Sequence, residues 1–185
     1  MNIDFIDRVK SYLNNLVIEL NKKVYVDNSW MKCAGKGLFA NNEFQTGDII
    51  VCYSGVIYDT NTAIKLQDKS YLMRLGPKLY VDARESPLIL ARYINDCRNV
   101  AGYNVIFDKI ESKKCAMVRA TRPIYKGEEI FVDYGKWYWA GVNIVNKDKD
   151  GNGNDKDDDN EMVEQRLSFA DLNRFRSQLD KFEYH

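Results

Sequence analysis

Two short segments of the sequence contain residue types that are able to bind a ligand and to orient a reacting group. Gly35-Lys36-Gly37 precedes the apolar Leu38-Phe39-Ala40, and Asp133-Tyr134-Gly135 follows another apolar run much later in the chain. Glycines let the backbone approach a ligand closely, and a tyrosine hydroxyl both donates and accepts hydrogen bonds. Each segment alone is weak evidence. No third glycine opens a helix, so the first segment is not the dinucleotide-binding fingerprint.

The histidine content narrows the possible chemistry. The chain has one histidine, His185, which is its last residue and lies where fraying is usual. Ser-His-Asp triads, Cys-His dyads and His-ligated zinc sites all need an ordered imidazole, so these mechanisms are disfavoured. Tyrosine, carboxylate, lysine, cysteine and backbone dipoles are left to carry any reaction.

The composition indicates one intracellular domain with no strong electrostatic preference. The 185 residues suffice for a single core with appendages, and no uninterrupted apolar run predicts a membrane span. Lys+Arg and Asp+Glu both number 27, which gives no global attraction to nucleic acid or to a membrane. The cysteines are widely spaced and no secretory signal is present, so we expect reduced thiols and neither disulfides nor a zinc site. They are Cys33, Cys52, Cys97 and Cys115.

Hydrophobic periodicity divides the chain into helical ends and a strand-rich middle. Residues 4–21 place apolar side chains on one stripe, which predicts an amphipathic helix in an N-terminal segment 1–22. Between residues 23 and 142 short apolar runs alternate with turn residues such as Gly47-Asp48 and Lys126-Gly127-Glu128, and this texture predicts an α+β fold. The predicted strands are 23–26, 48–53, 78–81, 103–108 and 114–119, and 86–95 is the one internal stretch predicted as a short helix.

The C-terminal part changes composition twice. Residues 143–160 form an acidic linker of low complexity, and apolar residues at helical spacing return in 161–185, which predicts a helical tail. The run from 148 to 159 begins like a calcium-binding EF-hand loop. It then places Asp155 where an apolar residue belongs and Asp159 where a glutamate belongs. A solvated linker is therefore favoured over a calcium site.

In their order along the chain, several motifs resemble those of SET-domain protein lysine methyltransferases. The segment 35–40 is followed by Tyr53-Ser54-Gly55, Ser70-Tyr71-Leu72, Ala91-Arg92-Tyr93-Ile94-Asn95-Asp96-Cys97 and Glu128–Gly135. The resemblance implies a β-rich SET fold with short sheets and a threaded, pseudoknot-like active site, flanked by N- and C-terminal amphipathic helices. It also implies methylation of a protein lysine by S-adenosylmethionine, with histone tails as the default substrate. The location would then be nuclear for a histone substrate and cytoplasmic otherwise.

The resemblance also implies roles for individual residues. Tyr134 matches the catalytic tyrosine, Tyr71 matches a tyrosine that lines the channel for the substrate lysine, and Trp139 matches an aromatic lid. Asn104 matches the asparagine that closes the central motif. No cysteine-rich zinc segment follows, so we expect no metal. The residues implied to bind S-adenosylmethionine are Gly35, Lys36, Gly37, Tyr80, Arg92, Asn95, Asp96, Tyr134 and Trp139.

Departures from the family pattern bear on the function. Asp96 replaces a histidine and one residue is missing before Cys97, a shorter form similar to the PR-domain branch of the family. This change supports an alternative, a catalytically silent SET-like protein-interaction module. Two residues before Tyr134, many relatives carry Phe or Tyr, whereas this chain has Val132. The smaller side chain predicts a roomier site that permits more than one methylation.

Overall fold

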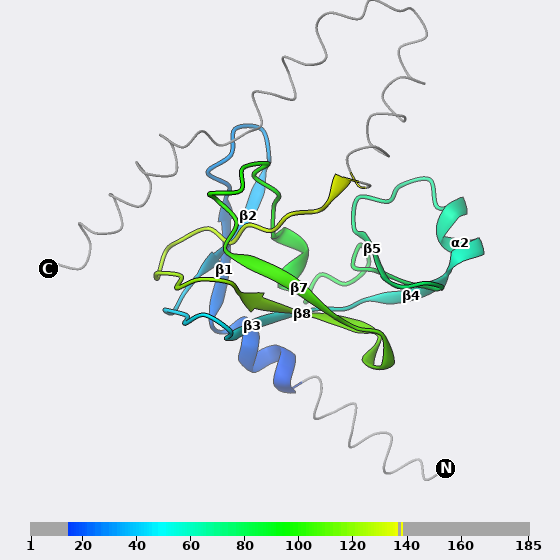
Figure 1. Ribbon diagram of the computed structural model, residues 1–185, viewed down its shortest axis with the longest axis horizontal. Helices are drawn as coiled ribbons and strands as arrows, with labels where there is room; N and C mark the ends of the chain where they lie inside the picture. The colour runs from blue at the N-terminus through cyan, green and yellow to red at the C-terminus, as the bar shows by residue number, and fades with distance from the viewer. Residues whose placement is uncertain (1–14, 137, 139–185) are drawn as a thin grey trace, which may run out of the picture.

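Strands dominate the part of the chain that the structure, a computed structural model, describes: residues 15–136 and 138 (Figure 1). Three small antiparallel sheets have the strand orders β1-β2, β3-β8-β7 and β4-β6-β5. The predicted β-rich α+β fold is therefore confirmed. In chain order the elements are β1 (Val24–Asn28), β2 (Lys36–Ala40), β3 (Ile49–Tyr53), β4 (Val56–Asp59), α2 (Thr60–Lys65), β5 (Leu72–Gly76), β6 (Leu79–Asp82), the 3₁₀ turn η1 (Leu90–Tyr93), β7 (Val105–Ile110), the 3₁₀ turn η2 (Glu111–Lys113) and β8 (Cys115–Ala120).

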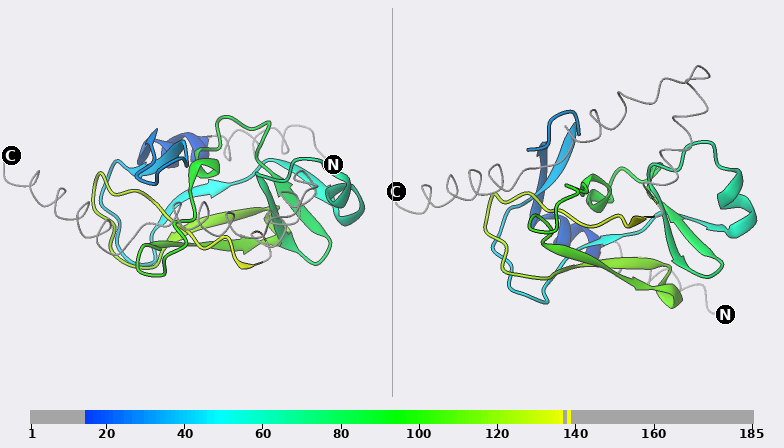
Figure 2. Two further views of the ribbon diagram at one scale, coloured as in Figure 1. Left: turned by 90° about the horizontal axis from the view of Figure 1, so that it is seen from above. Right: turned by 45° about the horizontal axis from the view of Figure 1, so that its top comes forward.

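One large hydrophobic core joins the three sheets. Each sheet contributes a fully buried aliphatic side chain, Leu38 from β2, Val51 from β3 and Val81 from β6. The β1-β2 hairpin and the β4-β6-β5 sheet lie at opposite ends of the described part, with β3-β8-β7 between them (Figures 1 and 2). Burial of these apolar faces supplies the main driving force for folding.

Five predicted strands correspond to β1, β3, β6, β7 and β8 within a few residues, while β2, β4 and β5 carry no strand prediction. β2 contains the Gly-Lys-Gly motif, and glycine favours strands little by itself. Its strand conformation comes from its pairing with β1, which runs from Val24 opposite Ala40 to Asn28 opposite Lys36. β4 and β5 flank β6 in the same way. Cross-strand pairing, which local sequence does not reveal, decides all three.

The helix prediction for residues 86–95 is wrong. This stretch forms only the 3₁₀ turn η1. Its backbone N–H groups bond to carbonyls three residues back, as from Ile89 to Ser86 and from Ile94 to Ala91. η1 packs against β1, β2 and β3, and these tertiary contacts override the helical pattern.

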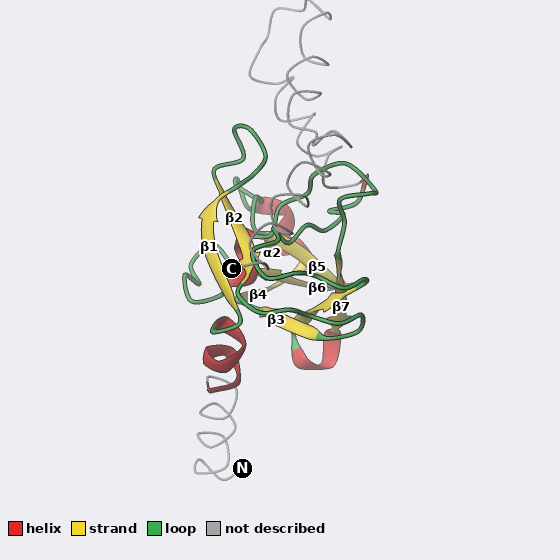
Figure 3. Ribbon diagram, turned by 90° about the vertical axis from the view of Figure 1, so that its left-hand side faces the viewer, coloured by secondary structure: helices red, strands yellow, loops and turns green. Residues whose placement is uncertain are grey.

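The internal α-helix lies elsewhere, at α2. Its N-cap is Asp59, whose carboxylate accepts a hydrogen bond from the backbone N–H of Thr62 at 2.8 Å. Of the predicted N-terminal helix, residues 15–21 are helical and lead directly into β1 (Figure 3). The predicted linker 143–160 and helical tail 161–185 lie outside the described residues.

Two loops of similar sequence pair with each other and bring distant parts of the chain together. Residues 40–48 and 120–128 each run through a bend into a glycine turn. At their centres Phe44 and Ile124 exchange both backbone hydrogen bonds at 2.9 Å. This pairing places the segment after the second loop beside β2, where Ile130 N–H donates to Leu38 O at 2.8 Å. The glycines of the two confirmed turns are Gly47 and Gly127, with φ values of 93° and 84°.

The segment that follows the second loop threads between two earlier parts of the chain. Phe131 forms a parallel bridge with Asn95, and Val132 N–H donates to Asn95 O at 3.0 Å. On the other side, Phe131 O accepts from Asn104 N–H at 3.1 Å. The Asn104 amide is fully buried, accepts from Phe131 N–H at 2.8 Å and donates to Glu129 O at 2.8 Å. This crossing is the pseudoknot-like arrangement expected from the sequence.

We expect Asn104→Ala to lower the free energy of unfolding by about 2–4 kcal/mol, because it leaves a buried N–H and a buried carbonyl unpaired. Urea denaturation followed by circular dichroism measures this change. The matched control is Asn61→Ala, at an exposed position in α2. A loss below about 1 kcal/mol for Asn104→Ala would show that the side chain does not hold the crossing.

Candidate active site

A cavity of about 310 Å³ lies where the predicted catalytic and cofactor-binding segments meet. It contains five of the residues singled out from the sequence, although they come from distant parts of the chain. A larger hollow of about 600 Å³, between the helical residues 15–21 and the loop before β3, contains none of them. The smaller cavity is therefore the candidate site. Its lining residues are Ala34, Lys36, Ser70, Tyr71, Arg92, Tyr93, Asn95, Tyr134 and Tyr138.

Tyr134 is held at both ends. Its hydroxyl donates to Ile94 O at 2.6 Å, and its backbone N–H donates to the Asp96 carboxylate at 3.0 Å. The ring meets that of Tyr138 edge to face, with centroids 4.6 Å apart. Burial raises the pKa of Tyr134 far above its ordinary value, with smaller contributions from neighbouring tyrosines and from Asp96. The hydroxyl is therefore neutral and acts by hydrogen bonding, not as a base.

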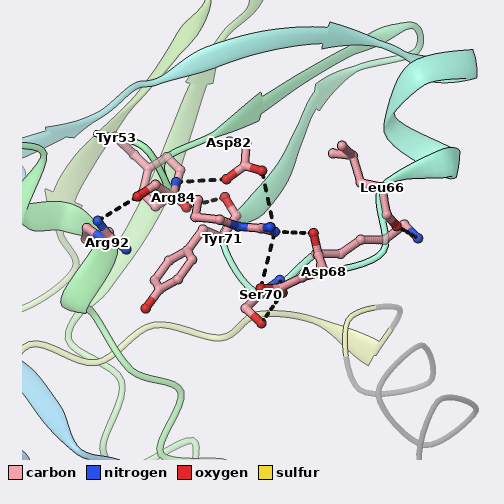
Figure 4. Close-up of polar contacts among 9 residues, drawn as sticks. Tyr53, Leu66, Asp68, Ser70, Tyr71, Asp82, Arg84 and Arg92 are labelled. Carbon is pink, nitrogen blue, oxygen red and sulfur yellow. Dashed lines mark hydrogen bonds and ion pairs between the residues drawn. The ribbon is translucent and has the colours of Figure 1, made fainter. Parts of the chain in front are cut away.

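Tyr71 is fixed by its backbone and by its ring. Its carbonyl accepts from the hydroxyl of Tyr53 at 2.6 Å, and the guanidinium of Arg92 lies over its ring, 4.2 Å from the centroid (Figure 4). The ring of Tyr53 in turn packs edge to face on Phe107 of β7. The wall of the cavity is thus tied to the core behind it.

Arg84 connects the loop that carries Ser70 and Tyr71 to β6. Its guanidinium donates to the carbonyl of Asp68 and lies 3.4 Å from that residue's carboxylate and 3.8 Å from the carboxylate of Asp82 (Figure 4). Its own carbonyl accepts from the guanidinium of Arg92 at 2.9 Å. Arg92 thus supports Tyr71 from the backbone of a neighbouring strand end, a structural role in addition to the predicted contact with a cofactor.

The glycine motif and Asn95 meet at a carboxylate that the sequence reasoning missed, Glu129. The amide of Asn95 donates to Lys36 O at 2.9 Å and to Glu129 Oε1 at 3.3 Å. A Cβ atom on Gly37 would lie 2.1 Å from Glu129 Oε1, so only glycine fits there. The signal available in the sequence was a charged residue directly before the apolar run 130–132.

Glu129 also holds the loop before the glycine motif. Its side chain is fully buried, accepts from the hydroxyl of Ser29 at 2.7 Å and accepts from the backbone N–H of Trp30 at 2.7 Å. Burial raises the pKa of the Glu129 carboxyl to about 7, although the hydrogen bonds from Ser29, Trp30 and Asn95 oppose this rise. One buried side chain thus links three segments that surround the candidate site.

The remaining predicted cofactor residues do not line the cavity. Tyr80 lies in β6, opposite Tyr58 of β4, and Gly35 precedes β2 with a φ of 72°. Asp96 is 3% exposed, and its oxygens accept hydrogen bonds from within the protein. Trp139 lies outside the described residues. The cofactor roles of these residues stay predictions.

A family comparison decides what this arrangement belongs to. The sequence model of the SET domain matches residues 35–135, more than half of the 185-residue chain. The chain belongs to the SET domain family. The match begins at the glycine motif and ends directly after Tyr134, so it includes every described residue that lines the cavity except Ala34 and Tyr138.

Known proteins are similar to this SET domain in sequence and in structure. The N-lysine methyltransferase KMT5A-A of Danio rerio is 31% identical over 112 residues, which cover 55% of this chain and 32% of that protein. An active polycomb repressive complex 2 in the basal state matches with a TM-score of 0.52 and 28% identity, over 61% of this chain and 15% of the other. The Chaetomium thermophilum polycomb repressive complex 2 matches with a TM-score of 0.51, 25% identity and the same coverage. The chain thus spans about a third or less of these proteins.

Two further searches of the described residues returned nothing. Within 15–136 and 138, no group of three or more His, Cys, Asp or Glu side chains is arranged to hold a metal ion. In the same part of the SET domain, no helix is long and apolar enough to cross a membrane. The segment that begins like an EF-hand lies outside the described residues.

The raised pKa of Glu129 predicts a pH dependence of stability. Its folded pKa is about 7 and that of an unfolded glutamate is about 4.3. Between these values the folded state binds more protons, so the stabilisation is full below the lower value and is lost as the pH rises through the higher one. We expect the free energy of unfolding of the wild type to fall by about 2–3 kcal/mol between pH 5 and 8, relative to Glu129→Gln.

Urea denaturation at a series of pH values measures this difference. Glu43→Gln, at an exposed carboxyl, is the matched control and should follow the wild type. Parallel pH profiles for the wild type and Glu129→Gln would contradict the raised pKa.

Proposed function

We propose that this SET domain transfers the methyl group of S-adenosylmethionine to a lysine side chain of a protein. One observation carries the proposal. A single cavity is lined by Tyr134 and Tyr71, which match the catalytic and channel tyrosines, and by Lys36, Arg92 and Asn95, which match cofactor-binding positions. A methyl transfer needs donor and acceptor to meet in one enclosed space, and this cavity brings the matching residues together.

The residues at the cavity fit the proposed cofactor. Lys36 and Arg92 place positive charge at a wall of the cavity, which suits the carboxylate of an amino-acid ligand. The Nε atom of Arg92 is buried without a hydrogen-bond partner, so a donor remains for a ligand oxygen. When bound, S-adenosylmethionine supplies an electrophilic methyl group on a positively charged sulfur. Lys36, Arg92 and Asn95 would hold it.

The cavity would favour the neutral form of a substrate lysine. The rings of Tyr71, Tyr93, Tyr134 and Tyr138 surround the space and limit the access of water. Desolvation disfavours the ammonium form and lowers the pKa of the lysine. The proton leaves to solvent, and the amine lone pair is then free to form the new N–C bond as the C–S bond breaks.

Tyr134 would act by position. Its neutral hydroxyl lies at the cavity and is itself held by Ile94 O at 2.6 Å. From there its oxygen is able to accept a hydrogen bond from the lysine amine and to orient the lone pair for in-line attack. Such alignment of two reactants contributes several kcal/mol of barrier reduction without any proton transfer by the enzyme.

The substrate class follows from the relatives. The relative from Danio rerio is an N-lysine methyltransferase by name, and a further similar structure, at 26% identity and a TM-score of 0.50, is polycomb repressive complex 2 in complex with H3K27me3 and H3K27M. These names support a lysine in a histone tail as the acceptor and a nuclear location. The alternative is the catalytically silent module, which the replacement at Asp96 favours.

Replacing the catalytic tyrosine tests the proposal. We expect wild-type protein to transfer labelled methyl groups to core histones or to proteins of a cell lysate, and Tyr134→Phe to lower kcat by about a hundredfold, since the orienting hydroxyl is lost. Scintillation counting of resolved gel bands measures the transfer. Tyr125→Phe, at a half-exposed ring outside the cavity, is the matched control. A wild type that binds no S-adenosylmethionine by calorimetry would establish the silent module instead.

The size of the side chain before the catalytic tyrosine predicts the product. Val132 is 2% exposed and packs in the same core cluster as Tyr134. Because a valine occupies less space than the Phe or Tyr of many relatives, we expect dimethylated or trimethylated lysine to accumulate. Mass spectrometry of a substrate peptide over time measures the product. A reaction that stops at monomethyllysine with excess cofactor would contradict this prediction.

A further inference from the structure

Asp96 is the clearest departure of this chain from its family pattern, and it lies in the interior next to the candidate site. Its side chain is 3% exposed, and its two oxygens accept three hydrogen bonds. Oδ1 accepts from Arg98 N–H and from the Tyr103 hydroxyl, both at 2.7 Å, and Oδ2 accepts from Tyr134 N–H at 3.0 Å. One carboxylate therefore joins three separate segments.

The Asp96 contact belongs to a set that fixes the catalytic segment. Ile94 O holds the hydroxyl of Tyr134, Asn95 O holds the N–H of Val132 and the Asp96 carboxylate holds the N–H of Tyr134. Three consecutive residues thus grip one short stretch of backbone and its functional side chain. A shift of the Tyr134 backbone would move the hydroxyl with it, and a misplacement of about 1 Å in such a group costs about a hundredfold in rate.

A carboxylate suits this position because all three partners donate. An ionised carboxylate only accepts hydrogen bonds, whereas an asparagine would turn an NH₂ group toward one of the donors. The hydroxyl of Tyr103 keeps its proton, since burial and the bond to Asp96 raise its pKa far above the ordinary value. Three short bonds offset the cost of burying the charge.

We propose that Asp96 is a positioning residue, whose buried carboxylate fixes the backbone of Tyr134 and through it the catalytic hydroxyl. This inference rests on the proposed methyltransferase function. It differs from the role that the family resemblance implies for Asp96, which is contact with the cofactor. The two roles separate in kinetics, because a positioning residue acts on kcat whereas a cofactor contact acts first on cofactor affinity.

The test compares Asp96→Asn with the wild type and with Asp133→Asn. Asp133 is an exposed carboxylate beside Tyr134, and its bond to Gly135 N–H at 2.7 Å survives as an asparagine oxygen. For each protein, calorimetry measures the Kd for S-adenosylmethionine, initial rates on a histone-tail peptide measure kcat and KM, and thermal unfolding checks the fold. We expect Asp96→Asn to lower kcat at least about tenfold and to change the Kd less than about twofold. Asp133→Asn should match the wild type.

A second variant covers the case in which Asp96→Asn does not fold. Tyr103→Phe removes one donor from the carboxylate and leaves the bond to Tyr134 in place. We expect an intermediate loss of kcat, about threefold, again with an unchanged Kd.

Two results would overturn the role of Asp96. One is a wild-type kcat in Asp96→Asn, or in Tyr103→Phe where Asp96→Asn does not fold. The other is a weakened Kd with a normal kcat at saturating cofactor, which would assign Asp96 to the cofactor. A wild type that transfers no methyl group to any acceptor contradicts the proposed function itself, and the positioning role then falls with it.

Discussion

The parallel bridge between Asn95 and Phe131 is the contact on which the candidate site depends. It brings the central motif against the final motif, although the two lie far apart in the chain. Closing such a long loop costs conformational entropy before any contact forms. The cost is met by interactions on both flanks of Phe131, from Asn95 on one side and from Asn104 on the other. Without the bridge, Tyr134 would not lie near Lys36 or Tyr71.

Buried polar side chains take the place of regular sheet at this crossing. The threaded segment runs as an isolated strand, so many of its backbone groups have no ladder partner. Asn104, Glu129 and Asp96 supply the missing hydrogen bonds from their side chains. Each is almost completely buried, and each bonds to groups from at least two segments. Networks of this kind rigidify a structure when every member is satisfied, which is what the placement of a reacting hydroxyl requires.

The sequence predicted the parts of this fold that local pattern controls. The apolar runs of β3 and β8 and the turns at Gly47 and Gly127 were visible, and the motif order identified the residues around the cavity. The strand conformation of β2 was not visible, because it depends on β1 rather than on its own glycines. The turn at η1 was mistaken for a longer helix, because the contacts that shorten it come from other strands.

Glu129 shows most clearly why part of the site escaped prediction. In the sequence it is one of two adjacent glutamates after a turn, a pattern typical of an exposed loop. In the structure it is fully buried against Gly37, while Glu128 pairs with Arg122 at 2.7 Å. Pairing of the two similar loops turns this stretch inward, and the similarity of the loops was itself present in the sequence. A search for internal repeats would have pointed to it.

The charges around the cavity have one common consequence for the proposed chemistry. A methyl acceptor must be a neutral amine, and a free carboxylate at the channel would stabilise the ammonium form instead. Asp68 and Asp82 lie close to the wall that carries Tyr71, but the guanidinium of Arg84 lies within 4 Å of both carboxylates. The guanidinium of Arg92 sits over the ring of Tyr71, on the cavity itself. Positive charge next to the channel and paired negative charge behind it both lower the pKa of an entering lysine. The arginines of this wall therefore favour the nucleophile that the tyrosines orient.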